Sequence, residues 1–122
     1  MREILTTVNP NLSQEIMEKT PLRYAKALLE FTKSYNDNIS EAIGEAVFDN
    51  EGYNELIIVR DINFSSICEH HMLPFFGTVD IGYIPKEKIF GLSKFPRLVD
   101  YLSKKMHLQE RLTKEIADTI DR

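Results

Sequence analysis

The chain has 122 residues, of which 43% are hydrophobic, so it is long enough for one compact domain with a core and too short for two. Its 15 Lys and Arg residues are outnumbered by 19 Asp and Glu residues, and the net charge of −4 argues against a nucleic-acid partner bound through bulk positive charge. The longest apolar run, residues 56–59, is far too short for a membrane span, and no secretory signal pattern precedes it. A single cysteine, Cys68, excludes an intrachain disulfide and is typical of a cytoplasmic protein.

The N-terminal third is expected to be helical. Residues 1–19 form a short lead-in that can include a helix begun by Ser13, and the main domain occupies residues 20–122. Thr20-Pro21 predicts a helix start, with Thr as the cap and Pro in the first turn, and the apolar spacing carries this helix to about Tyr35. A second short helix is predicted to begin at Ser40 and to carry three apolar residues, Ile43, Ala46 and Val47.

Two β-strands are predicted in the middle of the chain, at residues 55–64 and 75–84, with a loop over residues 65–74 between them. Simple alternation places Leu56, Ile58, Ile62 and Phe64 on one face of the first strand and Ile57 and Val59 on the other.

The C-terminal third reads as a turn over residues 85–88 followed by two amphipathic helices. The first begins near residues 91–94 and the second near Leu108. Their predicted inward residues are Phe95, Leu98, Val99, Leu102 and Met106, then Leu112, Ile116 and Ile120. Two strands are too little sheet for so many apolar helix faces, so we expect further strands from another chain or a longer sequence.

The Cys68-Glu69-His70-His71 segment is the most informative stretch for chemistry. Cys sulfur and His nitrogen are the ligands that Zn²⁺ prefers, and neighbouring side chains diverge in an extended backbone, so one histidine can bind the metal while the other stays free. A free imidazole beside a metal-activated water suits acid–base work near neutral pH. The alternative is a small buried thiol next to two surface histidines.

Two further clusters are candidates for binding a substrate. Ser93, Lys94 and Arg97 gather at a helix N-terminus, where backbone N–H groups favour a phosphate, and the first helix adds Arg23 and Lys26. The alternative is a capped helix with solvated basic residues.

The last helix opens with Gln109-Glu110, whose carboxylate can accept two hydrogen bonds from a guanine edge or can simply complement the helix dipole. The residues alone do not choose between these roles.

Six segments, in this order, resemble the GTP cyclohydrolase I family. They are residues 20–27 (TPLRYAKA), 58–62 (IVRDI), 68–75 (CEHHMLPF), 82–85 (GYIP), 91–94 (GLSK) and 109–113 (QERLT). The resemblance implies an α+β tunnelling fold, in which an antiparallel sheet with helices on one face joins the sheets of neighbouring subunits in a homodecamer.

By motif position, the resemblance implies that Cys68 and His71 ligate Zn²⁺ and that His70 handles protons at the purine ring. It implies that Ser93, Lys94 and Arg97, helped by Lys26, hold the triphosphate of GTP and that Glu110 and Gln109 hold the guanine edge. The implied reaction is hydrolytic opening of the GTP imidazole ring, which gives formate and dihydroneopterin triphosphate for folate or tetrahydrobiopterin synthesis.

The family continues with two more strands and a His-x-Cys segment that supplies a third zinc ligand, and this chain has no such segment. A catalytic zinc normally has three protein ligands and a water. The expected explanations are a truncated enzyme, a splice product or a split enzyme completed by another chain. The alternative function is an inactive isoform that acts as a structural or dominant-negative partner of the full enzyme. A related tunnelling-fold enzyme acting on another purine or pterin fits the GLSK and QE motifs less well.

Overall fold

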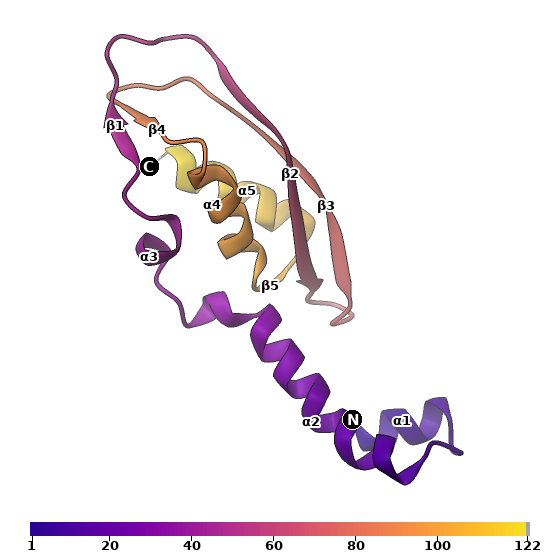
Figure 1. The fold of residues 1–122 in the computed structure, drawn as a ribbon. Helices are drawn as coiled ribbons and strands as arrows, with labels where there is room; N and C mark the ends of the chain where they lie inside the picture. Colours follow the sequence, from indigo (N-terminus) through magenta and orange to yellow (C-terminus); the bar gives the residue numbers. More distant parts are fainter. Residues whose placement is uncertain (122) are drawn as a thin grey trace. The chain divides into compact units, whose positions relative to one another are not determined.

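The computed structural model describes residues 1–121 and divides the chain into two compact units, Met1–Phe31 and a second unit that begins at Thr32. The first unit contains helices α1 (Arg2–Val8) and α2 (Gln14–Phe31). The second is mixed helix and sheet, which is compatible with the α+β class (Figure 1). Its elements are η1 (Lys33–Tyr35), α3 (Ile39–Ile43), β1 (Val47–Asp49), β2 (Ile57–Cys68), β3 (Pro74–Tyr83), β4 (Lys88–Phe90), α4 (Lys94–Ser103), β5 (Met106–His107) and α5 (Gln109–Asp121).

The predicted helix start at Thr20-Pro21 is wrong, because α2 begins at Gln14 and encloses Pro21. The hydroxyl of Ser13 accepts a hydrogen bond from the Ile16 N–H at 3.4 Å, as a helix cap does. Side-chain pairs four residues apart, Gln14 with Glu18 and Glu15 with Lys19, support the turns that precede the proline. The α-helix then ends at Phe31, and the short 3₁₀ helix η1 follows it.

The predicted cap at Ser40 is also wrong, since Asn38 caps α3 and its side chain accepts from the Ser40 N–H at 3.0 Å. The helix ends at Ile43, and the C-cap residue Gly44 has a φ of 72° that favours glycine. Val47 therefore lies outside the helix in β1, which pairs with β4 in a two-stranded antiparallel sheet that the sequence reading missed.

The β2–β3 hairpin is the main sheet of the second unit, and α4 and α5 lie on one of its faces (Figure 1). Strand β2 continues to Cys68 and β3 begins at Pro74. The predicted loop over residues 65–74 is therefore wrong, and only residues 69–73 form a turn. The two-residue strand β5 joins the other edge of β2 in parallel, so the sheet order is β3-β2-β5 and the sheet is not purely antiparallel. Met106, expected on a helix, lies in β5.

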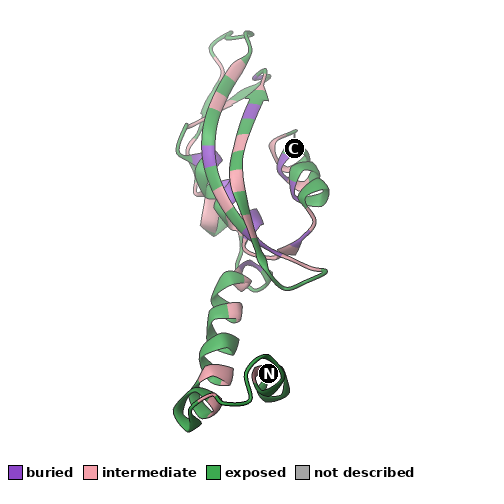
Figure 2. Ribbon diagram, turned by 90° about the vertical axis from the view of Figure 1, so that its right-hand side faces the viewer, coloured by how far each residue is buried: buried purple, intermediate pink, exposed green. Residues whose placement is uncertain are grey.

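A β-bulge between Val59 and Ile62 reverses the predicted facing of the start of β2. Asp61 adopts a left-handed φ of 58°, and its N–H bonds to the Asp80 carboxylate at 2.8 Å. As a result Ile58 is exposed although Ile62 is buried, and the alternation of buried and exposed residues along the hairpin is visible in Figure 2. Alternation of side chains between the two faces of a strand shifts by one position wherever a bulge inserts an extra residue.

The core of the second unit lies between the hairpin and the two helices, as the helical spacing predicts. Phe95 and Val99 are almost fully buried, with exposures of 1% and 0%. The other buried members of the cluster are Ile62, Ile81, Leu98, Leu102, Leu112 and Ile116. This packing fixes the start of α5 relative to the end of β2, where the candidate site lies.

Candidate metal and substrate site

The turn between β2 and β3, residues 69–73, holds its own shape through main-chain hydrogen bonds. The Cys68 N–H donates to the Leu73 carbonyl and the Met72 N–H donates to the Cys68 carbonyl, each at 2.8 Å. Met72 takes a left-handed φ of 54°, which is uncommon for a residue with a side chain. The positions of the residues around Cys68 are therefore set by local backbone geometry.

Cys68 and His71 are brought together by this turn. The Cys68 Sγ and His71 Nδ1 atoms are 3.6 Å apart. Zinc bound tetrahedrally at about 2.3 Å from sulfur and about 2.0–2.1 Å from nitrogen places those two atoms about 3.6 Å apart. The pair thus fits two corners of a zinc site, although within residues 1–121 no set of three or more His, Cys, Asp and Glu side chains is placed to hold a metal ion.

His70 is exposed, and its ring stands edge-on to that of His71. The ring centroids of His70 and His71 are 6.2 Å apart, with an angle of 84° between the ring planes. Of the two histidines, His71 is the one whose ring nitrogen lies 3.6 Å from the Cys68 Sγ. His70 is consequently available to a bound molecule.

Glu69 and Arg111 form an ion pair that sequence reasoning missed. Arg111 Nη1 and Nη2 donate to the two carboxylate oxygens at 2.6 and 3.1 Å. The hydrogen bond from Arg111 lowers the pKa of Glu69, and the same contact raises the pKa of Arg111. The two residues are 42 positions apart, so no local pattern in the sequence could pair them.

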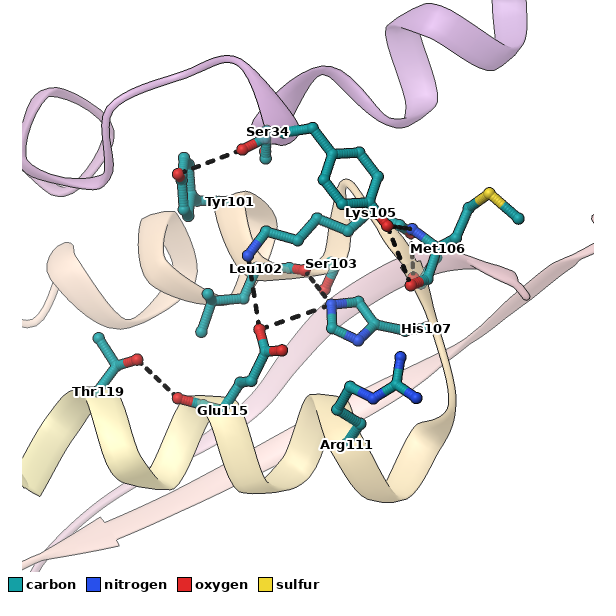
Figure 3. Close-up of polar contacts among 12 residues, drawn as sticks. Ser34, Tyr101, Leu102, Ser103, Lys105, Met106, His107, Arg111, Glu115 and Thr119 are labelled. Atoms are coloured by element: carbon teal, nitrogen blue, oxygen red, sulfur yellow. Dashed lines mark hydrogen bonds and ion pairs between the residues drawn. The ribbon is translucent and has the colours of Figure 1, made fainter.

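His107 is the second feature that the sequence did not single out. It is 2% exposed, its Nε2 lies 2.9 Å from the Leu102 carbonyl, and its Nδ1 has no hydrogen-bond partner among the described residues (Figure 3). Burial lowers its pKa, although the Glu115 carboxylate at 3.8 Å opposes that shift. His107 pairs with Cys68 across the β2–β5 ladder, so a buried imidazole lies next to the end of β2 that carries Cys68.

Gln109 and Glu110 open α5, as predicted, and both are exposed. Because β5 immediately precedes them and pairs with the end of β2, they lie at the same end of the unit as Cys68. The ion pair between Arg111 and Glu69 joins the two segments directly. The structure thus gathers the predicted metal, proton-transfer and guanine residues in one region.

The predicted triphosphate residues lie elsewhere. Ser93, Lys94 and Arg97 are at the start of α4, and this ten-residue helix, about 15 Å long, separates them from β5. Lys94 is buried, and its ammonium donates to the Gly44 carbonyl at 2.6 Å, whereas Ser93 and Arg97 are exposed. Lys26 is an exposed residue of α2, in the other compact unit.

A groove of about 860 Å³, with both apolar and charged residues in its lining, lies between β3 and α5. Among the predicted site residues only Gln109 lines it, and most of its wall is supplied by residues such as Val79, Tyr83 and Ile116. Its lining contains neither histidine nor cysteine.

Comparison with known proteins gives one consistent family. A family model described as GTP cyclohydrolase I matches residues 1–122. The chain is similar to proteins named GTP cyclohydrolase 1 from Saccharomyces cerevisiae (50% identity over 118 residues), Dictyostelium discoideum (46% over 120) and Homo sapiens (45% over 117). These alignments cover 96%, 98% and 96% of this chain but 48%, 51% and 46% of the relatives, so the chain spans about half their length. Among residues 1–121 no helix is long and apolar enough to cross a bilayer.

Proposed function

The chain belongs to the GTP cyclohydrolase I family, and on that premise we propose that its β2–β3 turn and the start of α5 form part of a site that opens the imidazole ring of GTP by hydrolysis. The single observation that carries the proposal is the 3.6 Å separation of the Cys68 and His71 ligand atoms beside the exposed His70. The products would be formate and dihydroneopterin triphosphate, a precursor for folate or tetrahydrobiopterin.

Cys68 and His71 hold the zinc ion in this proposal, and the tight turn keeps their ligand atoms at the spacing of a tetrahedral chelate. When bound, zinc supplies a Lewis acid that activates water for attack on the purine ring. His70, which is exposed beside this pair, transfers a proton at the ring nitrogen as the bond to carbon breaks. A further ligand comes from outside the described residues.

Gln109 and Glu110 orient the purine in the same proposal. The Glu110 carboxylate can accept two hydrogen bonds from the guanine N1–H and 2-amino group, which adenine lacks as a pair. Both residues are exposed at the first turn of a helix that the core holds in place, so their side chains are free to receive a ligand.

Ser93, Lys94, Arg97 and Lys26 bind the triphosphate. Since the first three lie at the far end of α4 from the turn, we propose that a complete site combines the turn of one copy with the α4 start of another. This arrangement is consistent with a homo-oligomer built by a tunnelling fold, a decamer if it follows the resemblance, in the cytoplasm. Lys94 would exchange its bond to Gly44 for a phosphate when the substrate arrives.

Nucleotide discrimination tests the proposal. Titration of the chain with GTP, followed by NMR, is expected to shift the amide signals of residues 109–110 and of the turn, and ATP is expected to shift them less. Glu110→Gln and Glu110→Ala should both weaken GTP binding while the melting temperature stays the same. Equal responses to GTP and ATP, or a loss of melting temperature with unchanged GTP binding, would contradict the guanine role and favour dipole complementarity alone.

Zinc content separates the enzyme from the inactive-partner alternative. The chain by itself is expected to bind zinc weakly and to release no formate from GTP, because the described residues supply only two ligands. Mixed with a full-length relative, a catalytic half should gain one zinc per chain and keep formate release. An inactive partner would lower formate release and gain no zinc.

A further inference from the structure

We propose that Arg111 is a positioning residue, which holds the metal-binding turn in register with helix α5 through its two-point contact with Glu69. Both donors of the guanidinium face the carboxylate, at 2.6 and 3.1 Å. The side chains are 48% and 27% exposed, and exposed ion pairs add little to overall stability. A two-point contact between planar groups does, however, fix orientation as well as distance. The role toward a metal rests on the proposed function.

The contact joins a segment that the core fixes to one that it does not. Arg111 precedes Leu112, which is 2% exposed in the core, so the backbone of α5 is anchored at this point. Glu69 lies between Cys68 and His70 in a turn whose side chains are mostly exposed. Its N–H donates to the His107 carbonyl at 3.2 Å, which ties down one end of the residue. The carboxylate ties down the other end.

The pair also removes Glu69 as a competing ligand. An unpaired carboxylate next to Cys68 would be a hard oxygen ligand for any cation held by the turn. With both oxygens engaged by Arg111, the carboxylate points to α5, and Cys68 and His71 remain the residues in contact with each other. Arg111 therefore sets both the orientation of the turn and which ligand atoms the turn presents to a metal ion.

The test uses the whole chain and the variant Arg111→Lys, which keeps the charge and loses the planar fork. Amide hydrogen exchange reports on the turn without any metal, because the Cys68 and Met72 N–H groups both close it. We expect exchange at these two amides to be about fivefold faster in Arg111→Lys. Titration with Co²⁺, followed by its sulfur charge-transfer band, is expected to show affinity lowered about tenfold.

Two further variants control the measurement. Lys114→Arg changes another exposed cation of α5, which pairs only along its own helix with Asp118 at 2.5 Å in the described contacts, and it should behave as the unsubstituted chain. Glu69→Gln should reproduce the faster exchange of the Cys68 and Met72 amides seen in Arg111→Lys, and the double variant should add nothing to that exchange in either single variant.

The proposal is overturned if Arg111→Lys leaves both turn amides unchanged, or if it speeds exchange equally in the core helix α4. If the unsubstituted chain binds no Co²⁺, the amide measurement alone decides the role of the pair. Failure of the GTP titration would remove the proposed function and leave these turn measurements standing, so the two failures are distinguishable.

Discussion

The two ends of helix α4 present their candidate residues in different ways. Beyond its C-terminal end, the β2–β3 turn places the Cys68 Sγ and His71 Nδ1 atoms 3.6 Å apart. At its N-terminal end, the buried Lys94 bonds to the Gly44 carbonyl, whereas Ser93 and Arg97 reach solvent. The proposed metal-binding pair is therefore organised by local backbone geometry. The proposed phosphate-binding set has one member, Lys94, already engaged in a hydrogen bond within the fold.

The largest expected effect is the loss of stability when a side chain of the core that connects both ends of α4 is truncated. Phe95 lies at the start of α4, is 1% exposed and packs against Tyr83 at 5.3 Å between ring centroids. Phe95→Ala should lower the free energy of unfolding by about 3–5 kcal/mol, because it removes apolar contacts and leaves a cavity. Urea denaturation measures this, with exposed Phe76→Ala as the control. Equal losses in both variants would show that the core does not lie where the structure puts it.

Substitutions in the turn should come next. His71→Ala or Cys68→Ala should lower Zn²⁺ or Co²⁺ affinity by about tenfold to a hundredfold or more, since each removes a ligand. His70→Ala should keep the metal affinity of the unsubstituted chain, because the ring nitrogen beside the Cys68 Sγ is that of His71. Competition with a chromophoric chelator gives the affinities. If His70→Ala loses metal as fully as His71→Ala, the assignment of the two histidines is reversed.

Lys94 sharpens the comparison at the other end of α4. Lys94→Met keeps the aliphatic bulk but leaves the Gly44 carbonyl without its ammonium donor, which should cost about 1–2 kcal/mol of unfolding free energy. Arg97→Met, at an exposed position of the same helix turn, should change stability by less than about 0.5 kcal/mol. Thermal melts of both variants would test this. No loss in Lys94→Met would mean that this lysine is as free for phosphate as Arg97.

Acid should produce the smallest effect, in the sheet formed by β1 and β4. The hydrogen bond from Lys88 lowers the pKa of Asp49, so the stability that this pair contributes is present above the unfolded pKa of about 3.9 and is lost as the pH falls through the lower folded value. Both side chains are well exposed, so only slight fraying of this sheet is expected below about pH 4. Chemical shifts of the Phe48 and Ile89 amides should show it, and Asp49→Asn should abolish the step.

Much of the fold was predictable from patterns that lie within one element. The apolar spacing of α4 and α5 identified Phe95, Leu98, Val99, Leu102, Leu112 and Ile116, and all six are buried. The start of α5 at Gln109 and the β3 strand were also predicted closely. The strand facing was mispredicted where the bulge at Asp61 shifts the alternation of side chains. The helix start was mispredicted where Asn38, and not Ser40, caps α3.

The sequence by itself determined which residue types could do chemistry and that Cys68 and two histidines lie within four positions. Residue types alone left open which histidine approaches the cysteine, and the local turn closed at Met72 brings His71 to it. Only the tertiary structure decided that Arg111 meets Glu69, that His107 is buried, and that Lys94 bonds to Gly44. Each of these contacts joins elements far apart in the chain, and their partners are selected by how the helices pack on the hairpin, which no local pattern of residues encodes.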